Sequence, residues 1–441
     1  MTNSERVIAC IFLLATACLA QSKSPDPPVL DLSLEKAIEM ASSPQGNTSV
    51  QMALEAEKLN DSRYRAARSL LLPNLDGSVA EQNQTVNPRA LGLRFESPAF
   101  TVPSEVGPFN TFDARVRLTQ NLFNITDIRR SQAAHEDMQT AKSATDGVRA
   151  RVSASIVRLY AAALRADAQV AESDASIADA EALRDQVLHR AAAGEDTDLV
   201  ATRAKVNVAR SQQKKLSAET ARTRTQLELL QALGVSLDTS LHLTGSLEGA
   251  PGETRSVEEY VDMALKTRPE FREEDSRLRS AKLNENAARM ERMPSLEGYA
   301  DYGVLEGVQT HTAGAALRVP LFNGGRTSSD ETQATALMHQ EQIRQKDLRS
   351  QVELEIRQAL VSIASTRQQV QVAEQAIQLA NDELGRARRR FDAGVTNDVE
   401  VMDAQAQLAA ARTDRVDALF DYANARIDLA QATGAIATFS F

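Results

Sequence analysis

Two acidic residues, Glu400 and Asp403, have the type and spacing to act on a charged solute. Residues three apart share one face of a helix, so both carboxylates would present negative charge to the same side. Such a charged surface attracts cations. A structural role fits equally well, because Asn397 and Glu400 have capping-box spacing and acidic residues stabilise a helix N-terminus.

Residue types that carry out catalysis or hold cofactors show no pattern. The five histidines are scattered, without metal-ligand spacing and without serine or aspartate residues arranged around them. Gly324 and Gly325 follow a predicted strand but lack the lysine of a nucleotide-binding loop. The sequence therefore predicts neither an enzyme nor a metal or cofactor site.

Two glycine-centred turns must position the acidic pair. One contains Gly194 and Thr197, and the other contains Gly394, Val395 and Thr396. Glycine ends a helix in the left-handed conformation and threonine can cap the next helix. A structural turn and a docking tip both need these residues, so the turns alone do not discriminate between the two roles.

A run of arginines precedes the second turn, at positions 386, 388, 389 and 390. Basic residues at the end of a helix complement its dipole and remain solvated. Ion pairs across the turn, with Glu400 or Asp403, are the alternative interpretation.

The helix before the second turn carries a long apolar seam. Spaced three and four apart, the seam residues are Val352, Ile356, Ala359, Ile363, Thr366, Val370, Ala373, Ile377, Ala380, Leu384, Ala387 and Phe391. This heptad pattern predicts a helix over residues 326–391, about 100 Å long at ~1.5 Å per residue. A rod of this length must pack along other helices.

The plan occurs twice, because Gly394 and Gly434 follow Gly194 and Gly234 by 200 residues each. Such self-similarity predicts two copies of one design, residues 33–245 and 256–434, each with a leading helix, two strands, a long helix and a returning helix. The predicted elements are leading helices 33–68 and 256–292, strands 73–83, 112–122, 295–304 and 312–319, long helices 127–192 and 326–391, and returning helices 197–233 and 397–433. Residues 21–32 and 246–255 are predicted linkers, and residues 435–441 a C-terminal tail.

Residues 1–20 are predicted to form a secretory signal, with an apolar run that ends in small residues after Arg6. Both cysteines, Cys10 and Cys18, lie in this segment, so no disulfide is expected. Residues 15–18 (ATAC) resemble a lipoprotein cleavage box with alanine in place of its leucine, so Cys18 is either acylated or removed with the signal. The net charge of −10 argues against extensive nucleic-acid binding.

The four predicted strands of 8 to 11 residues have the length of tilted membrane-spanning strands. Four strands cannot close a barrel, and an open sheet edge is not tolerated in lipid. Closure therefore needs strands from other chains. Three chains would supply about twelve, which is within the range of outer-membrane barrels.

The sequence resembles the TolC-like outer-membrane efflux family. The resemblance extends from about Leu30 to Gly434 and is carried by residues 268–270 (RPE), 319–326 (VPLFNGGR), 390–396 (RFDAGVT) and 399–405 (VEVMDAQ). It implies a mostly α fold with a small β part. Long antiparallel coiled coils would form a trimeric α-barrel across the periplasm, continued in the outer membrane by a 12-stranded transmembrane β-barrel with four strands per chain.

The implied function is a passive exit duct of a tripartite efflux pump or type I secretion system. The implied partners are two further copies of the chain, a periplasmic adaptor (membrane fusion protein), through it an inner-membrane pump, and outer-membrane lipid. The alternative is a periplasmic coiled-coil scaffold or adaptor without a channel. An adaptor, however, would carry glycine-rich β domains around one helical hairpin, whereas two hairpins are predicted here.

The resemblance also assigns roles to the candidate residues. Glu400 and Asp403 would line the pore constriction, while the tip residues Gly194, Thr197, Gly394, Val395 and Thr396 would dock the adaptor. The first repeat departs from this pattern, since Val200 stands at the position equivalent to Glu400 and Asp198 lies nearby.

Overall fold

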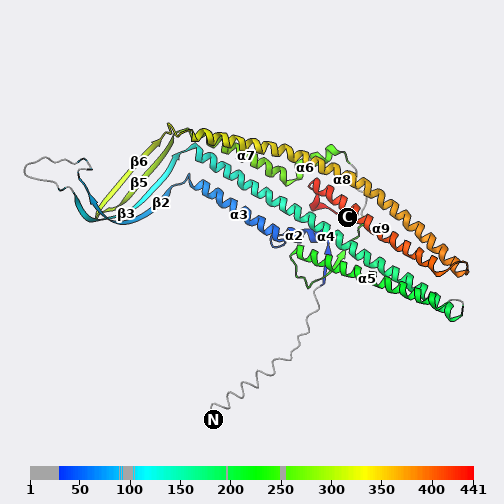
Figure 1. The fold of residues 1–441 in the computed structure, drawn as a ribbon. Coiled ribbons are helices and arrows are strands. Elements are labelled where there is room, and N and C mark those ends of the chain that lie inside the picture. The colour runs from blue at the N-terminus through cyan, green and yellow to red at the C-terminus, as the bar shows by residue number, and fades with distance from the viewer. Residues whose placement is uncertain are drawn as a thin grey trace, which may run out of the picture.

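The computed structural model describes residues 29–88, 90, 92, 103, 105–194, 197–248 and 255–441. The predicted signal, including Cys10 and Cys18, lies outside the described residues. The molecule is elongated, with a four-stranded sheet at one end and two helical turns at the other (Figure 1).

Two long helical hairpins form the body of the molecule. Helix α4 (Ile125–Ala192) returns as α5 (Asp198–Leu233), and α8 (Arg326–Asp392) returns as α9 (Asp398–Ala432). Every residue of the predicted seam on α8 is buried or partly buried, and α8 packs along α9. The heptad pattern therefore identified the face of α8 that is covered within the chain.

Shorter helices pack beside the two hairpins, and together they form a layer of side-by-side helices that we call the wall. Helix α3 (Thr48–Ser69) and α5 both pack on α4, while α7 (Pro269–Met290) and α9 both pack between α4 and α8. Two shorter helices thus match one long helix in length, as Figure 1 shows. One edge of the wall is formed by α3 and α5, and the other edge by α8.

Each leading helix is divided in two, although the sequence analysis predicted single helices. The first is divided into α2 (Leu34–Ser42) and α3, and the side chain of Asn47 caps α3 by accepting from the Ser49 amide at 2.8 Å. The second is divided into α6 (Val257–Thr267) and α7, which begins at Pro269. Proline lacks the amide hydrogen of a helix interior and disfavours the helical conformation in the preceding residue, Arg268.

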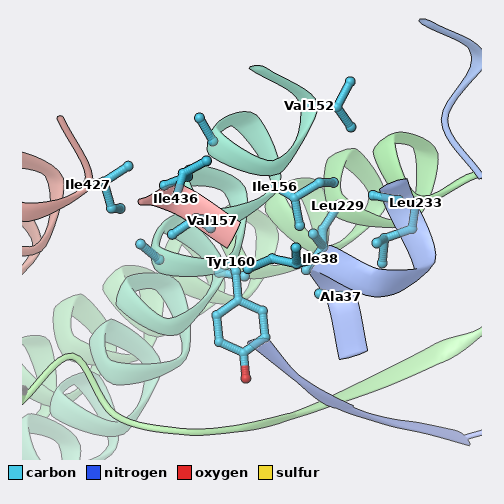
Figure 2. Packing of buried hydrophobic residues seen from close by; sticks show 14 of the residues in the cluster. Ala37, Ile38, Val152, Ile156, Val157, Tyr160, Leu229, Leu233, Ile427 and Ile436 are labelled. Atoms are coloured by element: carbon cyan, nitrogen blue, oxygen red, sulfur yellow. The ribbon is translucent and has the colours of Figure 1, made fainter. Parts of the chain in front are cut away.

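A parallel pair of short strands, β1 (Val29–Ser33) and β4 (Ser240–Thr244), was not predicted from the sequence. It covers the largest core cluster, in which Tyr160 is fully buried. The Tyr160 hydroxyl lies 2.7 Å from the Thr244 carbonyl oxygen and 3.0 Å from that of Leu32, one from each strand. In Figure 2 the ring points away from Ile156 and Val157 toward these strands. Burial raises the pKa of the Tyr160 hydroxyl, which stays protonated and able to donate.

The sheet has the order β2-β3-β5-β6, and all its neighbours are antiparallel. Its strands are β2 (Asn74–Val86), β3 (Val106–Phe123), β5 (Ser295–Leu305) and β6 (Val308–Arg318). Within the described residues, the outer edges of β2 and β6 pair with no other strand. The sheet is therefore open at both sides.

The two faces of this sheet differ in polarity, because side chains alternate along each strand. The register places Gly77, Val116 and Tyr302 side by side on one face. The apolar residues and glycines on that face are Leu75, Gly77, Val79, Phe112, Ala114, Val116, Leu118, Leu296, Gly298, Ala300, Tyr302, Val304, Ala313, Ala315 and Leu317. The polar residues on the same face are Glu81, Asn83, Asn110, Gln120, Gln309 and His311. On the opposite face, the Arg117 side chain pairs with Asp301 at 2.6 Å and Arg115 pairs with Asp113.

None of the helices in the described part of the chain combines the length and apolar character needed to cross a membrane.

Two carboxyl groups meet where α7 packs on α8. Glu274 is 6% exposed and faces Glu341. One oxygen of each carboxyl group is buried without a hydrogen-bond partner among the described residues. Burial raises the pKa of Glu274. The Glu341 carboxylate raises it further, because it can accept a hydrogen bond from protonated Glu274 and because its charge repels that of ionised Glu274, while Arg277 and Arg344 oppose the rise. A single proton shared by the pair would satisfy both unpartnered oxygens.

We therefore expect stability to fall as pH rises through the pKa of folded Glu274. Because this pKa lies above the ordinary glutamate value, the folded protein binds more protons than the unfolded chain in that interval. The slope for one proton is at most about 1.4 kcal/mol per pH unit. Glu274→Gln should reduce the decrease of the thermal midpoint as pH rises above the ordinary glutamate pKa, measured by circular dichroism on the purified protein.

Glu331→Gln is the matched control, since Glu331 of α8 forms ordinary ion pairs with Arg289 of α7 and with Arg292, just after the end of α7. This variant should retain the wild-type pH profile. Parallel profiles for wild type and Glu274→Gln would contradict the shared proton.

Candidate functional site

The turns of the two hairpins lie close together at the end of the molecule opposite the sheet (Figure 1). Gly194 and Gly394 adopt left-handed backbone angles, with φ of 81° and 68°. Among the described residues, no heavy atom beyond the immediate neighbours lies within 4 Å of an added Cβ at either position. The turns thus need glycine for its backbone conformation, and the space around both residues is open.

The remaining predicted tip residues differ in environment. Val395 is largely exposed. Thr197 is the N-cap residue of α5 but its side chain makes no capping hydrogen bond. The Thr396 hydroxyl hydrogen-bonds the carboxylate of Glu400. An exposed valine beside an open glycine turn is a surface that another protein can contact.

Glu400 connects the two sides of the second turn. Its carboxylate pairs with Arg390 at 2.6 Å, in addition to its bond with Thr396. Asn397 caps α9 by accepting from the Glu400 amide at 3.4 Å. The side chain of Glu400 thus binds Arg390 and Thr396, and the ion pair across the turn is present for one of the four arginines.

Asp403 lies about one turn further along α9 and is exposed. Within the described residues, its carboxylate has neither a hydrogen bond nor an ion pair. Glu400 and Asp403 share a face of α9 but differ in chemistry, because the charge of Glu400 is partly neutralised by Arg390. Asp403 is therefore the carboxylate free to act on a solute.

Asp179 on α4 accepts three hydrogen bonds from the second hairpin. Its carboxylate accepts from Arg388 of α8 at 2.8 Å and from Arg412 of α9 at 3.3 Å, and its carbonyl oxygen accepts from Gln405 at 2.7 Å. The sequence analysis did not single out Asp179. Nothing in the sequence shows that a residue more than 200 positions from its partners lies beside them.

Further bonds join the hairpins closer to the tips. Arg190 at the end of α4 donates to the Phe391 carbonyl oxygen at 2.8 Å, and its guanidinium lies 4.6 Å from the Phe391 ring centroid. Gln186 bonds the Asp392 carboxylate. Asp398, the first residue of α9, is 3% exposed and lies 3.9 Å from Arg203 of α5. The two tips therefore move as one unit unless these bonds break.

Among the described residues, no three His, Cys, Asp or Glu side chains gather closely enough to hold a metal ion.

The family described as outer membrane efflux protein matches residues 42–235 and 260–435. This match spans both hairpins, both strand pairs and both tips. The chain belongs to this family. This outer membrane efflux protein is accordingly located in the outer membrane and extends into the periplasm, and the resemblance stated from the sequence motifs is confirmed.

Solved structures share the fold. The chain is similar to the outer membrane protein VceC of Vibrio cholerae, with a TM-score of 0.75 and 21% identity over 91% of this chain and 96% of that one. It is also similar to the outer membrane channel CmeC of Campylobacter jejuni, with a TM-score of 0.76 and 17% identity over 91% of this chain and 85% of that one.

The match to a curated relative covers a smaller part of both chains. The alkaline protease secretion protein AprF of Pseudomonas aeruginosa is 24% identical over 243 residues, which are 53% of this chain and 50% of that protein. The chain thus spans about half the length of this relative.

Proposed function

We propose that this outer membrane efflux protein is a homotrimeric channel that forms the passive exit duct of a tripartite efflux pump or type I secretion system. Energy would come from an inner-membrane pump, reached through a periplasmic adaptor. The observation that carries the proposal is that one helix face is exposed at each edge of the wall. The counterparts of these two faces in the 200-residue repeat pack against each other within the chain.

The filled contact lies between α4 and α9. Ala161 and Ile427 belong to one core cluster there, and both are completely buried. The 200-residue repeat relates α4 to α8 and α9 to α5, so their counterparts are Val361 and Leu227. Val361 is 71% exposed and Leu227 is 41% exposed. The counterparts of both residues belong to the core, but within one chain no helix packs over Val361 or Leu227 in the same way.

A second copy of the chain supplies that neighbour. Placing α8 of one copy against α5 of the next repeats the α4–α9 contact and leaves new free edges that a further copy fills. Such a head-to-tail contact closes into a ring when the rotation allows. Three copies give six hairpins around the ring and twelve strands in one barrel, which agrees with the number implied by the family resemblance.

The sheet supports the same arrangement. Its free β2 and β6 edges would pair between copies, because unpaired backbone groups are not tolerated in lipid. Its apolar face would contact lipid and its polar face, with Arg117 and Asp301, would line the lumen. A periplasmic scaffold would leave the whole apolar face in water, which disfavours that alternative.

The tips would form the periplasmic mouth of the duct. Three copies of Glu400 and Asp403 would surround the constriction with negative charge, which selects cations and contributes to closure. The exposed turns at Gly194, Thr197, Gly394, Val395 and Thr396 would contact the adaptor. Separation of the tips to open the mouth would break the bonds of Asp179 and Arg190 between the hairpins.

The copy interface can be tested by cross-linking, since the chain after residue 20 contains no cysteine. Val361→Cys combined with Leu227→Cys should yield covalent dimers and trimers when a short bismaleimide is added to membranes. Each single variant should yield none, and neither should Val395→Cys combined with Leu227→Cys. Stable trimers that fail to cross-link through Val361 and Leu227 would contradict the assigned contact.

The constriction is tested by the Glu400→Ala, Asp403→Ala double variant in planar bilayers. Removing both carboxylates should increase single-channel conductance and reduce cation selectivity, because the charge at the narrowest point is lost. Asp238→Ala, at an exposed position after α5, serves as the control. Unchanged conductance and reversal potential in the double variant would remove these residues from the constriction.

Docking at the tip is tested by Val395→Trp. This change should leave trimers intact, because the side chain is exposed, and should abolish transport in cells by blocking the adaptor. Co-purification of the adaptor gives a second measurement. Full transport with normal adaptor capture would show that Val395 lies outside the docking surface.

A further inference from the structure

An apolar pocket of about 400 Å³ opens between α6, α8 and the end of α9. Tyr260, Tyr422 and Phe439 contribute aromatic walls, and Leu360 and Ile363 contribute aliphatic ones. Its size falls within the range of small-molecule sites, which are mostly apolar with a few polar groups that orient the ligand. The pocket is far along α9 from the tips, and all its lining residues come from one copy of the chain.

The corresponding place in the first repeat is filled by the protein itself. Tyr160 and Leu164, which lie 200 positions before Leu360 and Ala364, are buried in the core cluster there. Tyrosine to leucine and leucine to alanine each remove side-chain volume. The β1–β4 pair that covers Tyr160 also has no counterpart over the second pocket among the described strands. The second repeat thus keeps an apolar lining but lacks the atoms that fill it.

The charge at this place is also reversed. Asp167 in the first repeat, 3.9 Å from Arg222, corresponds to Arg367 at the pocket. Arg367 is exposed and forms neither a hydrogen bond nor an ion pair within the described residues. Arg426 also lines the pocket; it donates to the Ser440 carbonyl oxygen at 3.0 Å and lies over the Phe439 ring at 5.4 Å.

Among the described residues, the pocket lining includes two arginines and no acidic residue, in a chain whose net charge is −10. An arginine pair beside an apolar wall matches a ligand that has one anionic group and an apolar body. A cation would be repelled there. A neutral apolar molecule would offer no acceptor to Arg367, the arginine of the pair that has no partner among the described residues.

We propose that this pocket binds a free amphiphilic carboxylate, with its hydrocarbon body between Tyr260, Tyr422 and Phe439 and its carboxylate at Arg367 and Arg426. The site is formed within one copy of the chain and is separate from the constriction. A bound ligand would join α6, α8 and α9 where the returning helix ends.

Octanoate is a suitable probe, because it is soluble and bears the proposed chemistry. A photoreactive diazirine octanoate should label the full-length protein in nanodiscs saturably, and peptide mapping should place the adduct in α6, α8 or α9 at the pocket. Unlabelled octanoate should compete, and octylamine should not.

Two variants separate the charge from the cavity. Arg367→Gln should weaken octanoate competition at least about tenfold by removing a charge-assisted bond, the effect of ~1.4 kcal/mol. Ala364→Leu should weaken it as much by filling the space, with both arginines retained. Arg386→Gln, which alters an exposed arginine near the tip, should bind like wild type.

Several outcomes would overturn the proposal. These are adducts that map outside the pocket, competition by octylamine equal to that by octanoate, or unchanged affinity in both pocket variants with normal thermal midpoints. Equal competition by octanol would show an apolar site without selection for anions, and would overturn the assigned ligand class. None of these results requires a transport measurement.

Discussion

A helix about 100 Å long cannot cover its own apolar seam, and this constraint determines the rest of the molecule. The seam of α8 is covered by α9 within the hairpin, and α4 is paired with α5 in the same way. Packing the two hairpins together covers one further face of α4 and leaves one face of α8 and one of α5 open. The wall is thus complete inside the chain and incomplete at both edges.

Periodic features of this architecture could be predicted from the sequence. The three-and-four spacing from Val352 to Phe391 and the 200-residue shift between Gly194 and Gly394 reflect local geometry that recurs many times. A single exception, such as Arg184 on α4 at the position equivalent to the seam residue Leu384, therefore does not obscure the pattern. The four strands of the sheet could be predicted, but not all their bounds: β2 extends to Val86, beyond the predicted end at 83, and β3 begins at Val106 and contains Pro108, whereas a start at 112 was predicted. The polarity of the two sheet faces became evident only with the register, because Gly77, Val116 and Tyr302 come from three distant segments.

Features that rest on single long-range contacts could not be predicted. The β1–β4 pair joins two five-residue segments about 210 positions apart. Both alternate apolar and polar residues, as a strand does, but segments this short do not indicate which partner they pair with. Asp179 resembles any exposed acid on a helix until Arg388 and Arg412 are seen beside it. The acidic pair shows the same limit: its spacing was evident, but the binding of Glu400 to Arg390, which leaves Asp403 as the free charge, depends on the conformation of the turn.

The open β2 and β6 edges have a consequence for biogenesis. Each hairpin is built from neighbours in sequence and can fold in water by local contacts. The sheet cannot enter lipid with its edge groups unpaired, so in the proposed trimer insertion and assembly become one event. The rate of insertion would then depend on the concentration of folded chains in the periplasm, and a single copy would have no stable inserted state to populate.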